Sequence, residues 1–358
     1  MGVTKRTPIQ TQKETSEDLE FLKSLTEDVN KRLGKDVENQ LILGDEEDTV
    51  IVPYWVRTFI PQLDYAVGGK NHPGIPGGRI TELFGWEGAG KSTVALWITK
   101  CAMEQLNTFA VYQDAERVLT DEIIKGTGLN IPKVIVQNPD TLEEMFGSQE
   151  AIIESLTEKK YSKPFIITSD SIAACSTNSE IEGDYGDSTM GIHARIISQA
   201  LRKIKSPLFE HGILSIFCNQ CREKLNVSFG KNYTTAGGKA LPFYASVRIM
   251  LTRIKQIKQG DKVIGGTVEA KLEKNKVAPP FKKAEFDILY IEDEDGLTYP
   301  KIDCAGALLD WNKEHNLIGG GVGRYEINGK SYYKANAREL LENDPDLFNQ
   351  MVELAYSV

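Results

Sequence analysis

The sequence predicts an α/β protein with a mostly parallel, twisted β-sheet at its centre, an N-terminal helix–strand arm and a small α+β domain at the C-terminal end. Two observations lead to this prediction. Short apolar runs alternate with longer helical stretches through the middle of the chain, which is the order of β-α-β units. In addition, 358 residues are enough for one large α/β domain with one or two small satellites.

The elements of the central region, residues 51–291, follow from the apolar runs and their spacing. We expect helices near 92–106, 142–157 and 194–208. Strands are expected at 79–84, 108–112, 134–137, 164–168, 213–218, 246–253, 268–274 and 285–291. The late strands follow one another without long helices between them, so we expect that edge of the sheet to be antiparallel.

Two smaller regions flank the core. Residues 1–50 combine a helical pattern with a short strand at 41–43, and the helix carries Leu19, Leu22, Leu25 and Val29 at near-helical spacing. Such an arm cannot bury its own core, so it must pack on the main domain or on a neighbouring subunit. Residues 292–358 open with an acidic turn, and their Asn328-Gly329 pair between apolar residues predicts a hairpin.

Composition narrows the class of protein. Hydrophobic residues make up 41% and charged residues 26%, which excludes a disordered chain. No apolar run is long enough for a membrane span, so we expect no membrane partner. The N-terminus is polar and the five cysteines are scattered, so we expect a cytoplasmic protein with structural or incidental cysteines, including the isolated Cys218/Cys221 pair.

Charge is distributed unevenly along the chain. The net charge is −9, but residues 191–283 contain 18 Lys and Arg against 5 Asp and Glu. A basic segment within an acidic protein can still contact phosphates, because exposed charges act over about 8 Å at physiological salt. The charge pattern therefore allows a nucleic-acid partner.

Residues 85–92 match the phosphate-binding pattern G-x-x-x-x-G-K-[ST]. An apolar strand precedes the motif and a helix follows it, which favours this interpretation over a glycine-rich turn with an incidental lysine. Backbone N–H groups and the helix N-terminus would surround the phosphates of ATP, Lys91 would bridge the β- and γ-phosphates, and Ser92 would ligate Mg²⁺. The predicted nucleotide ligands are Gly85, Glu87, Gly88, Ala89, Gly90, Lys91, Ser92 and Thr93.

Two acidic residues follow other predicted strands. Asp170 ends an apolar run, and we interpret it as a ligand of the Mg²⁺ water shell rather than as a strand cap. Glu116 also follows a strand, at the sheet edge where ligands bind in open α/β folds. Spacing alone leaves Glu116 equally open to a role with the attacking water and to that of a surface acid.

Several further motifs resemble bacterial RecA recombinases. They are the stretch from Glu180 to Gly191, Ser198 to Lys203, Thr234 to Leu241, Phe243 to Arg248, Lys274-Asn275-Lys276 with Pro280-Phe281, and Ala284-Glu285-Phe286. The likeness runs in order from about residue 50 to the C-terminus, so it is specific. It implies a RecA-like P-loop ATPase core, and the divergence is what we would expect of a bacteriophage-encoded relative.

The resemblance assigns roles that spacing does not. Glu116 corresponds to the catalytic glutamate, Gln220 to the glutamine that senses the γ-phosphate, and Lys274 and Lys276 to lysines that reach the neighbouring subunit's ATP. Two DNA-binding loops correspond to about 182–191 and 221–240. The implied DNA-contacting or loop-hinge positions are Met190, Gly191, Arg195, Arg202, Arg222, Phe229, Gly237 and Gly238.

The resemblance implies a DNA-dependent ATPase that forms helical filaments on single-stranded DNA and exchanges strands with double-stranded DNA. The alternatives on the same core are a ring-forming hexameric helicase or translocase and a non-catalytic ATP-binding recombination mediator. The sequence departs from the family at the adenine site, where Thr120 and Ile123 replace aromatic and acidic residues. Arg117 also follows Glu116 directly, where it is placed to alter the environment of that carboxylate.

Overall fold

The structure, a computed structural model, describes residues 16–33, 52–184, 191–223 and 232–358. The chain divides into two compact units, residues 1–51 and 52–358. In the first unit the helix α1 (Ser16–Leu33) confirms the predicted helical spacing, and its Phe21, Leu22 and Leu25 side chains are exposed. The strand predicted at 41–43 lies outside the described residues. Among the described helices, none is both long and apolar enough to cross a membrane.

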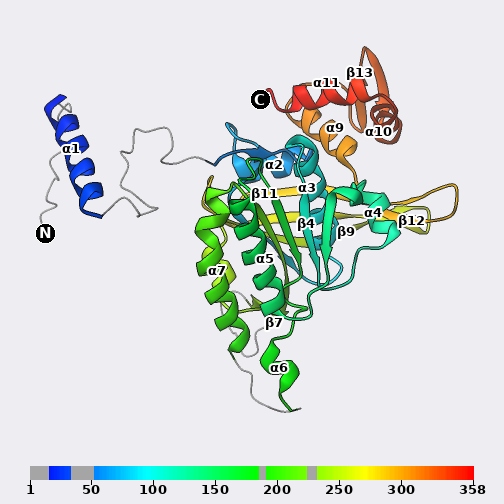
Figure 1. The fold of residues 1–358 in the computed structure, drawn as a ribbon. Coiled ribbons are helices and arrows are strands. Elements are labelled where there is room, and N and C mark those ends of the chain that lie inside the picture. The colour runs from blue at the N-terminus through cyan, green and yellow to red at the C-terminus, as the bar shows by residue number, and fades with distance from the viewer. Residues whose placement is uncertain (1–15, 34–51, 185–190, 224–231) are drawn as a thin grey trace, which may run out of the picture. The chain divides into compact units, whose positions relative to one another are not determined.

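The second unit is built on one large sheet in the order β12-β11-β10-β9-β3-β7-β6-β4-β5, with β8 added to β7 (Figure 1). The strands from β9 to β5 in this order are parallel, and those from β12 to β9 are antiparallel. Both features confirm the predicted fold class. The strand bounds are β3 (Ile80–Gly85), β4 (Ala110–Asp114), β5 (Val134–Gln137), β6 (Ile166–Asp170), β7 (Leu214–Glu223), β8 (Tyr233–Thr235), β9 (Val247–Gln259), β10 (Lys262–Asn275), β11 (Lys283–Glu292) and β12 (Thr298–Ile302).

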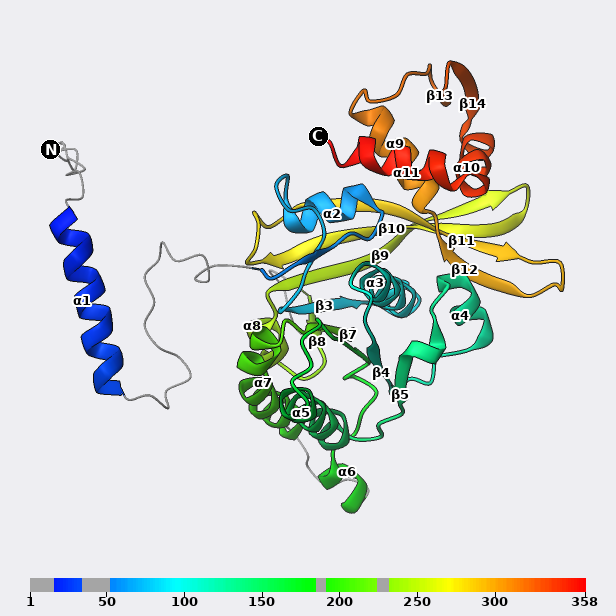
Figure 2. The same ribbon diagram turned by 45° about the horizontal axis from the view of Figure 1, so that its top comes forward.

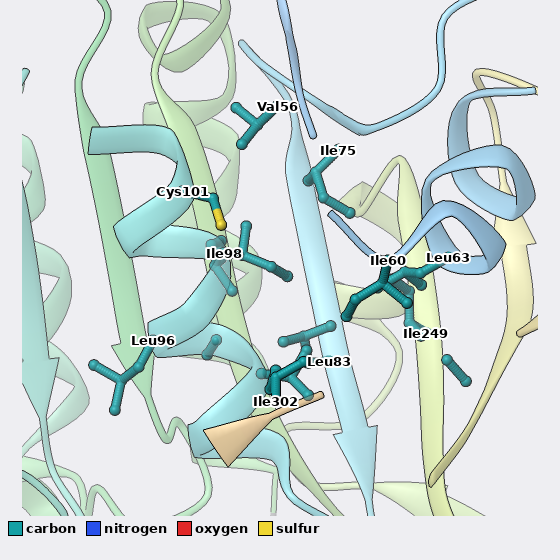
Figure 3. Close-up of a cluster of buried hydrophobic side chains, with 14 of the residues drawn as sticks. Val56, Ile60, Leu63, Ile75, Leu83, Leu96, Ile98, Cys101, Ile249 and Ile302 are labelled. Atoms are coloured by element: carbon teal, nitrogen blue, oxygen red, sulfur yellow. The ribbon is translucent and has the colours of Figure 1, made fainter. Parts of the chain in front are cut away.

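Neighbouring residues of a strand point to opposite faces of the sheet, so the apolar strands present apolar side chains on both faces. Helices cover each of these faces. Ile166 packs in the cluster that contains α3 (Lys91–Gln105), whereas Ile167 packs in the cluster that contains α5 (Leu142–Glu158) and α7 (Ile192–Glu210). Figure 2 shows α3 apart from the α5 and α7 pair, and Figure 3 shows the apolar side chains of α3 beside β3. The smaller helices are α2 (Pro61–Gly68), α4 (Asp121–Thr127), α6 (Asn178–Glu182) and α8 (Ala240–Tyr244), and β1 (Trp55–Val56) pairs with β2 (Ile75–Pro76).

The strands β9 and β10 extend well beyond the predicted ranges 246–253 and 268–274. Their common tip is largely exposed, and its few apolar residues are scattered among polar and charged ones, so no long apolar run marks it in the sequence. β12 was also not expected: it pairs with β11 across the acidic turn, inside the region that we assigned to the C-terminal domain. The predicted boundary at residue 292 therefore cuts through a hairpin of the sheet.

The remaining C-terminal elements are α9 (Cys304–Glu314), the β13 (Arg324–Ile327) and β14 (Lys330–Tyr333) hairpin, α10 (Lys334–Asn343) and α11 (Pro345–Ala355). The hairpin confirms the prediction at Asn328-Gly329, where both residues have positive φ. Figures 1 and 2 both place these helices on the α2 side of the antiparallel strands. Tyr65 of α2 stacks on Trp311 of α9 at 4.7 Å between ring centroids.

Asp64, the residue before Tyr65 in α2, is a buried carboxylic acid. The Asp64 side chain accepts hydrogen bonds from the backbone N–H and hydroxyl of Thr58 and from the Tyr356 hydroxyl. Burial outweighs these contacts and raises the pKa of Asp64 to about 7, from an ordinary value of 3.8. The folded protein therefore holds a proton on Asp64 that the unfolded chain releases.

We predict that Asp64→Asn changes how stability depends on pH. Because the folded-state pKa is raised, stability from this proton is fully present below about pH 4 and is lost as the pH rises through 7. The difference between the folded-state and unfolded-state pKa values corresponds to a stabilisation of roughly 4 kcal/mol as an upper bound. Denaturant unfolding at pH 5 and pH 7.5 should show that the stability advantage of the wild type over the variant shrinks at the higher pH. An equal difference at both pH values would contradict the prediction.

Candidate functional site

The predicted phosphate-binding loop lies between β3 and α3, as its sequence context requires. Gly88 and Gly90 have φ angles of 68° and 87°, which residues with a Cβ rarely adopt. At Gly85, an added Cβ would lie 2.3 Å from the carbonyl oxygen of Leu251, so only glycine fits beside β9. Ala89 is buried under the loop. The loop thus presents backbone N–H groups at the first turn of α3, where an anion is stabilised.

Lys91 and Ser92 are the first two residues of α3. The Lys91 side chain is largely buried, and its Nζ donates to the carbonyl oxygen of Trp86 at 3.0 Å, which folds it over the loop. The Ser92 hydroxyl lies near the Asp170 carboxylate and acts to lower its pKa. The structure therefore brings the ammonium group, the hydroxyl and the β6 carboxylate together around the same loop.

Asp170 fits the role of a ligand to a hydrated Mg²⁺ ion. It is fully buried at the end of β6, and its Oδ2 accepts from the Tyr112 hydroxyl at 2.7 Å, while its Oδ1 has no hydrogen-bond partner within the described ranges. Burial raises its pKa, although the Tyr112 and Ser92 hydroxyls act in the opposite direction. In the described parts of the chain, no cluster of three or more His, Cys, Asp or Glu residues forms a metal site by itself. Mg²⁺ typically takes only one or two protein groups and completes its shell with phosphates and water.

Glu116 follows β4 and contacts the equivalent ends of two neighbouring strands. Its Oε1 accepts a hydrogen bond from the Ser171 hydroxyl, just after β6, and another from Gln220 Nε2 on β7 at 3.0 Å. Glu116 is therefore held by two donors, which is not the environment of a free surface acid. The direct contact between Glu116 and Gln220 could not be read from sequence spacing, because the residues are 104 positions apart.

The phosphate loop, the start of α3, Glu116 and Gln220 border one cavity of about 300 Å³. From the predicted set, its walls contain Glu87, Gly88, Gly90, Lys91, Ser92, Thr93, Glu116 and Gln220. Its walls also contain Val118, Ile123, Arg253, Ile288, Tyr290 and Pro300. Arg253 and Tyr290 were not expected. They come from β9 and β11, and no local motif marks them; only the strand order brings them to the loop.

The structure places the residues that differ from the family pattern at the expected adenine site, Thr120 and Ile123. Ile123 lines the cavity, whereas the Thr120 side chain caps the start of α4. Tyr290 of β11 also lines the cavity, so the walls offer a base both an aliphatic and an aromatic side chain. Arg117 forms an exposed ion pair with Asp140 at 3.3 Å rather than contacting Glu116.

β7 also leads from this cavity to a second, polar cleft. Two residues after Gln220, Arg222 lines the cleft together with Glu180, His193, Gly237 and the segment 173–176. His193 Nε2 lies 3.3 Å from Glu180 Oε2, joining the two sides of the first predicted DNA loop. The cleft is thus lined by residues on either side of the first predicted loop and by residues within the second.

The other predicted DNA-contacting residues have the following places. Arg195 and Arg202 are exposed and seven positions apart on α7, so they lie on one face of that helix, which begins after Gly191. Gly237 and Gly238 both have positive φ, and a Cβ at Gly237 would lie 2.3 Å from Ile197 of α7. Met190 and Phe229 lie outside the described residues.

Lys274 and Lys276 lie far from the phosphate loop of their own chain. Lys274 is near the end of β10, directly across from Arg248 at the start of β9, and β9 begins beside the start of β3. The phosphate loop follows the opposite end of β3. Lys274 Nζ donates instead to the carbonyl oxygens of Pro242 and Phe243 at 2.7 and 2.8 Å. These lysines therefore do not form part of the cavity in their own subunit.

Comparisons with known proteins agree with the sequence motifs. A family model described as the RecA N-terminal domain matches residues 20–295. Protein RecA of Clostridioides difficile is 38% identical over 340 residues, covering 94% of this chain and 92% of that protein. Protein RecA of Saccharopolyspora erythraea is 39% identical over 325 residues, with 90% and 88% coverage. Protein RecA of Acidothermus cellulolyticus is 40% identical over 311 residues, with 86% and 84% coverage. The chain belongs to the RecA family.

Proposed function

We propose that this protein is a DNA-dependent ATPase that assembles into helical filaments on single-stranded DNA and exchanges that strand with homologous double-stranded DNA. The observation that carries the proposal is the hydrogen bond from Gln220 to Glu116. It joins a nucleotide cavity to the strand that continues into the polar cleft and the second predicted DNA loop. A change at the nucleotide can thus reach the DNA loops through one side chain.

The residues of the cavity suit ATP hydrolysis by positioning and electrostatics. The loop N–H groups and Lys91 would hold the phosphates, and Ser92 and Asp170 would hold Mg²⁺, which neutralises charge on the phosphates when it is bound. Glu116 would orient the attacking water and accept its proton. Gln220 has an amide that can donate to Glu116 or turn to a γ-phosphate oxygen, so its position would depend on which nucleotide is present.

Assembly into a filament would complete the site. Because Lys274 and Lys276 lie at the opposite end of the sheet from their own phosphate loop, they can contact a phosphate only in a neighbouring subunit. The edge strand β5 supports such assembly, since Ile135 and Val136 are exposed on an edge to which no strand of the described residues pairs. An interface that contains a nucleotide makes filament formation dependent on ATP.

The interface to DNA would be basic and indifferent to sequence. Arg195 and Arg202 are exposed on α7, the helix that follows the first predicted loop, and Arg222 is exposed at the start of the second. Contacts of this kind position a phosphate backbone without reading bases. Strand exchange requires that indifference, because base pairing itself tests homology.

We predict that Glu116→Gln separates binding from turnover. The amide keeps the size of the side chain but cannot accept a proton, so DNA-stimulated ATP hydrolysis should fall by about 10²-fold or more. Filaments on single-stranded DNA should still form with ATP, seen as open helices by electron microscopy. The exposed Glu154→Gln variant on α5 is the matched control. Retained hydrolysis in Glu116→Gln would remove Glu116 as the base, and closed rings would contradict the filament.

We predict that two inactive variants restore activity when they are mixed. Lys91→Ala lacks the phosphate contact but retains the lysines, and the double variant Lys274→Ala/Lys276→Ala has the reverse defect. Each should be inactive alone in DNA-stimulated ATP hydrolysis. Interfaces that combine an intact loop from one subunit with intact lysines from the other should hydrolyse ATP in the mixture.

The matched control for the mixing experiment is Lys282→Ala/Lys283→Ala, which removes two charges from the next segment and should remain active alone. If the mixture is no more active than its two components measured separately, the lysines do not act between subunits.

A further inference from the structure

A row of charged residues crosses three neighbouring strands at the start of the parallel sheet. Glu82 on β3 is paired in register with Arg248 on β9, and Arg248 is paired with Lys274 on β10. Arg248 Nε donates to Glu82 Oε2, whose side chain is completely buried. Within the described residues, Glu82 is thus the anion that offsets Arg248 in a cluster that also contains Lys274 and Lys276. A buried carboxylate in such a place is costly unless its partners are fixed.

The other oxygen of Glu82 connects this row to β7. Asn219 Nδ2 donates to Glu82 Oε1 at 3.0 Å and to the carbonyl oxygen of Ala236 at 3.1 Å. Asn219 Oδ1 accepts from the backbone N–H of Gln220 at 2.8 Å. One buried amide therefore joins the Glu82 carboxylate, the Gln220 backbone and the residue that precedes Gly237-Gly238.

The segment that contains these glycines is held at both ends by the same row. Ala236 is held by Asn219, which Glu82 orients. The other end, α8, is held by Lys274, whose Nζ donates to the carbonyl oxygens of Pro242 and Phe243. An ammonium group has three donors, so Lys274 keeps one for a phosphate while it holds both carbonyl oxygens, and a phosphate that took a second donor would displace one of them.

We propose that Glu82 is a positioning residue that couples the lysine edge of the sheet to the second DNA loop, through Arg248 on one side and Asn219 on the other. This inference rests on the proposed function, because it assumes that Lys274 meets a neighbour's nucleotide. When Lys274 and Lys276 engage a phosphate, the charge facing Arg248 changes, and Arg248 and Glu82 adjust together. Asn219 then shifts Ala236 and Gln220, so the loop and the γ-phosphate sensor respond to both the neighbouring nucleotide and their own.

The test uses the full-length chain and a labelled oligo-dT strand. The dissociation constant for the strand is measured with a slowly hydrolysed ATP analogue and without nucleotide, and the ratio of the two values reports coupling. Both neighbours of Glu82 donate to it, so Glu82→Gln offers only one acceptor for two donors. We expect this variant to lower the ratio roughly tenfold, within the usual range of coupling between sites. Its affinity without nucleotide should stay that of the wild type, which a general loss of structure would not allow.

Asn219→Ala should reduce the ratio by a similar factor, and the double variant Glu82→Gln/Asn219→Ala should lose no more than the larger single effect, because both residues act in one chain of contacts. The exposed Glu285→Gln is the matched control and should keep the wild-type ratio. If Glu82→Gln does not unfold cooperatively, the same measurement is made on Glu82→Gln/Arg248→Gln, which removes both charges and carries the same expectation.

The outcomes separate this inference from the proposed function. A wild-type protein whose DNA affinity does not depend on nucleotide would overturn the proposed function and this inference with it. A wild type that responds to nucleotide, with a Glu82 variant that responds equally, would overturn only the role of Glu82. Fully additive losses in the double variant would also overturn it, since they would mean that Glu82 and Asn219 act independently.

Discussion

The structure depends on one constraint, which is that β7 serves two sites at once. Its Gln220 donates to Glu116 in the nucleotide cavity, and Arg222, two residues later, lines the polar cleft between the predicted DNA loops. A strand fixed in the middle of a sheet cannot move one of these residues without affecting the other. The side chains around Gln220, rather than the strand itself, are therefore where a change of nucleotide can be converted into a change in the loops.

The same sheet separates two groups of residues that, in the proposed function, act on one nucleotide. The phosphate loop follows one end of β3, and Lys274 and Lys276 lie beside the other end, two strands away. No motion within one subunit closes this gap while the sheet remains paired. In the proposed filament a second subunit would therefore complete the site, and the row from the buried Glu82 through Arg248 to Lys274 would connect the two nucleotides that each subunit touches.

Much of this organisation could be predicted from the sequence, because its signals are local. The range of β5 and the glycines around Lys91 needed only the apolar pattern and the motif. The tip of β9 and β10 was missed because its few apolar residues are scattered among polar and charged ones. β12 was missed because it is short and contains Pro300. Arg253, Tyr290 and Glu82 were missed for another reason: each acquires its neighbours from strand order and register. Met190 and Phe229 remain predictions.

The most direct test of whether Gln220 transmits the nucleotide state to the DNA loops is to remove the Gln220 side chain, which donates to Glu116. Gln220→Ala leaves the phosphate loop, Glu116 and the basic residues in place. We expect a slowly hydrolysed ATP analogue to tighten the binding of single-stranded DNA to the wild type. The variant should lose most of this gain and keep only the part that Asn219 carries to Ala236. A variant that retains the full gain in affinity would contradict the account, because the nucleotide would then reach the loops without Gln220.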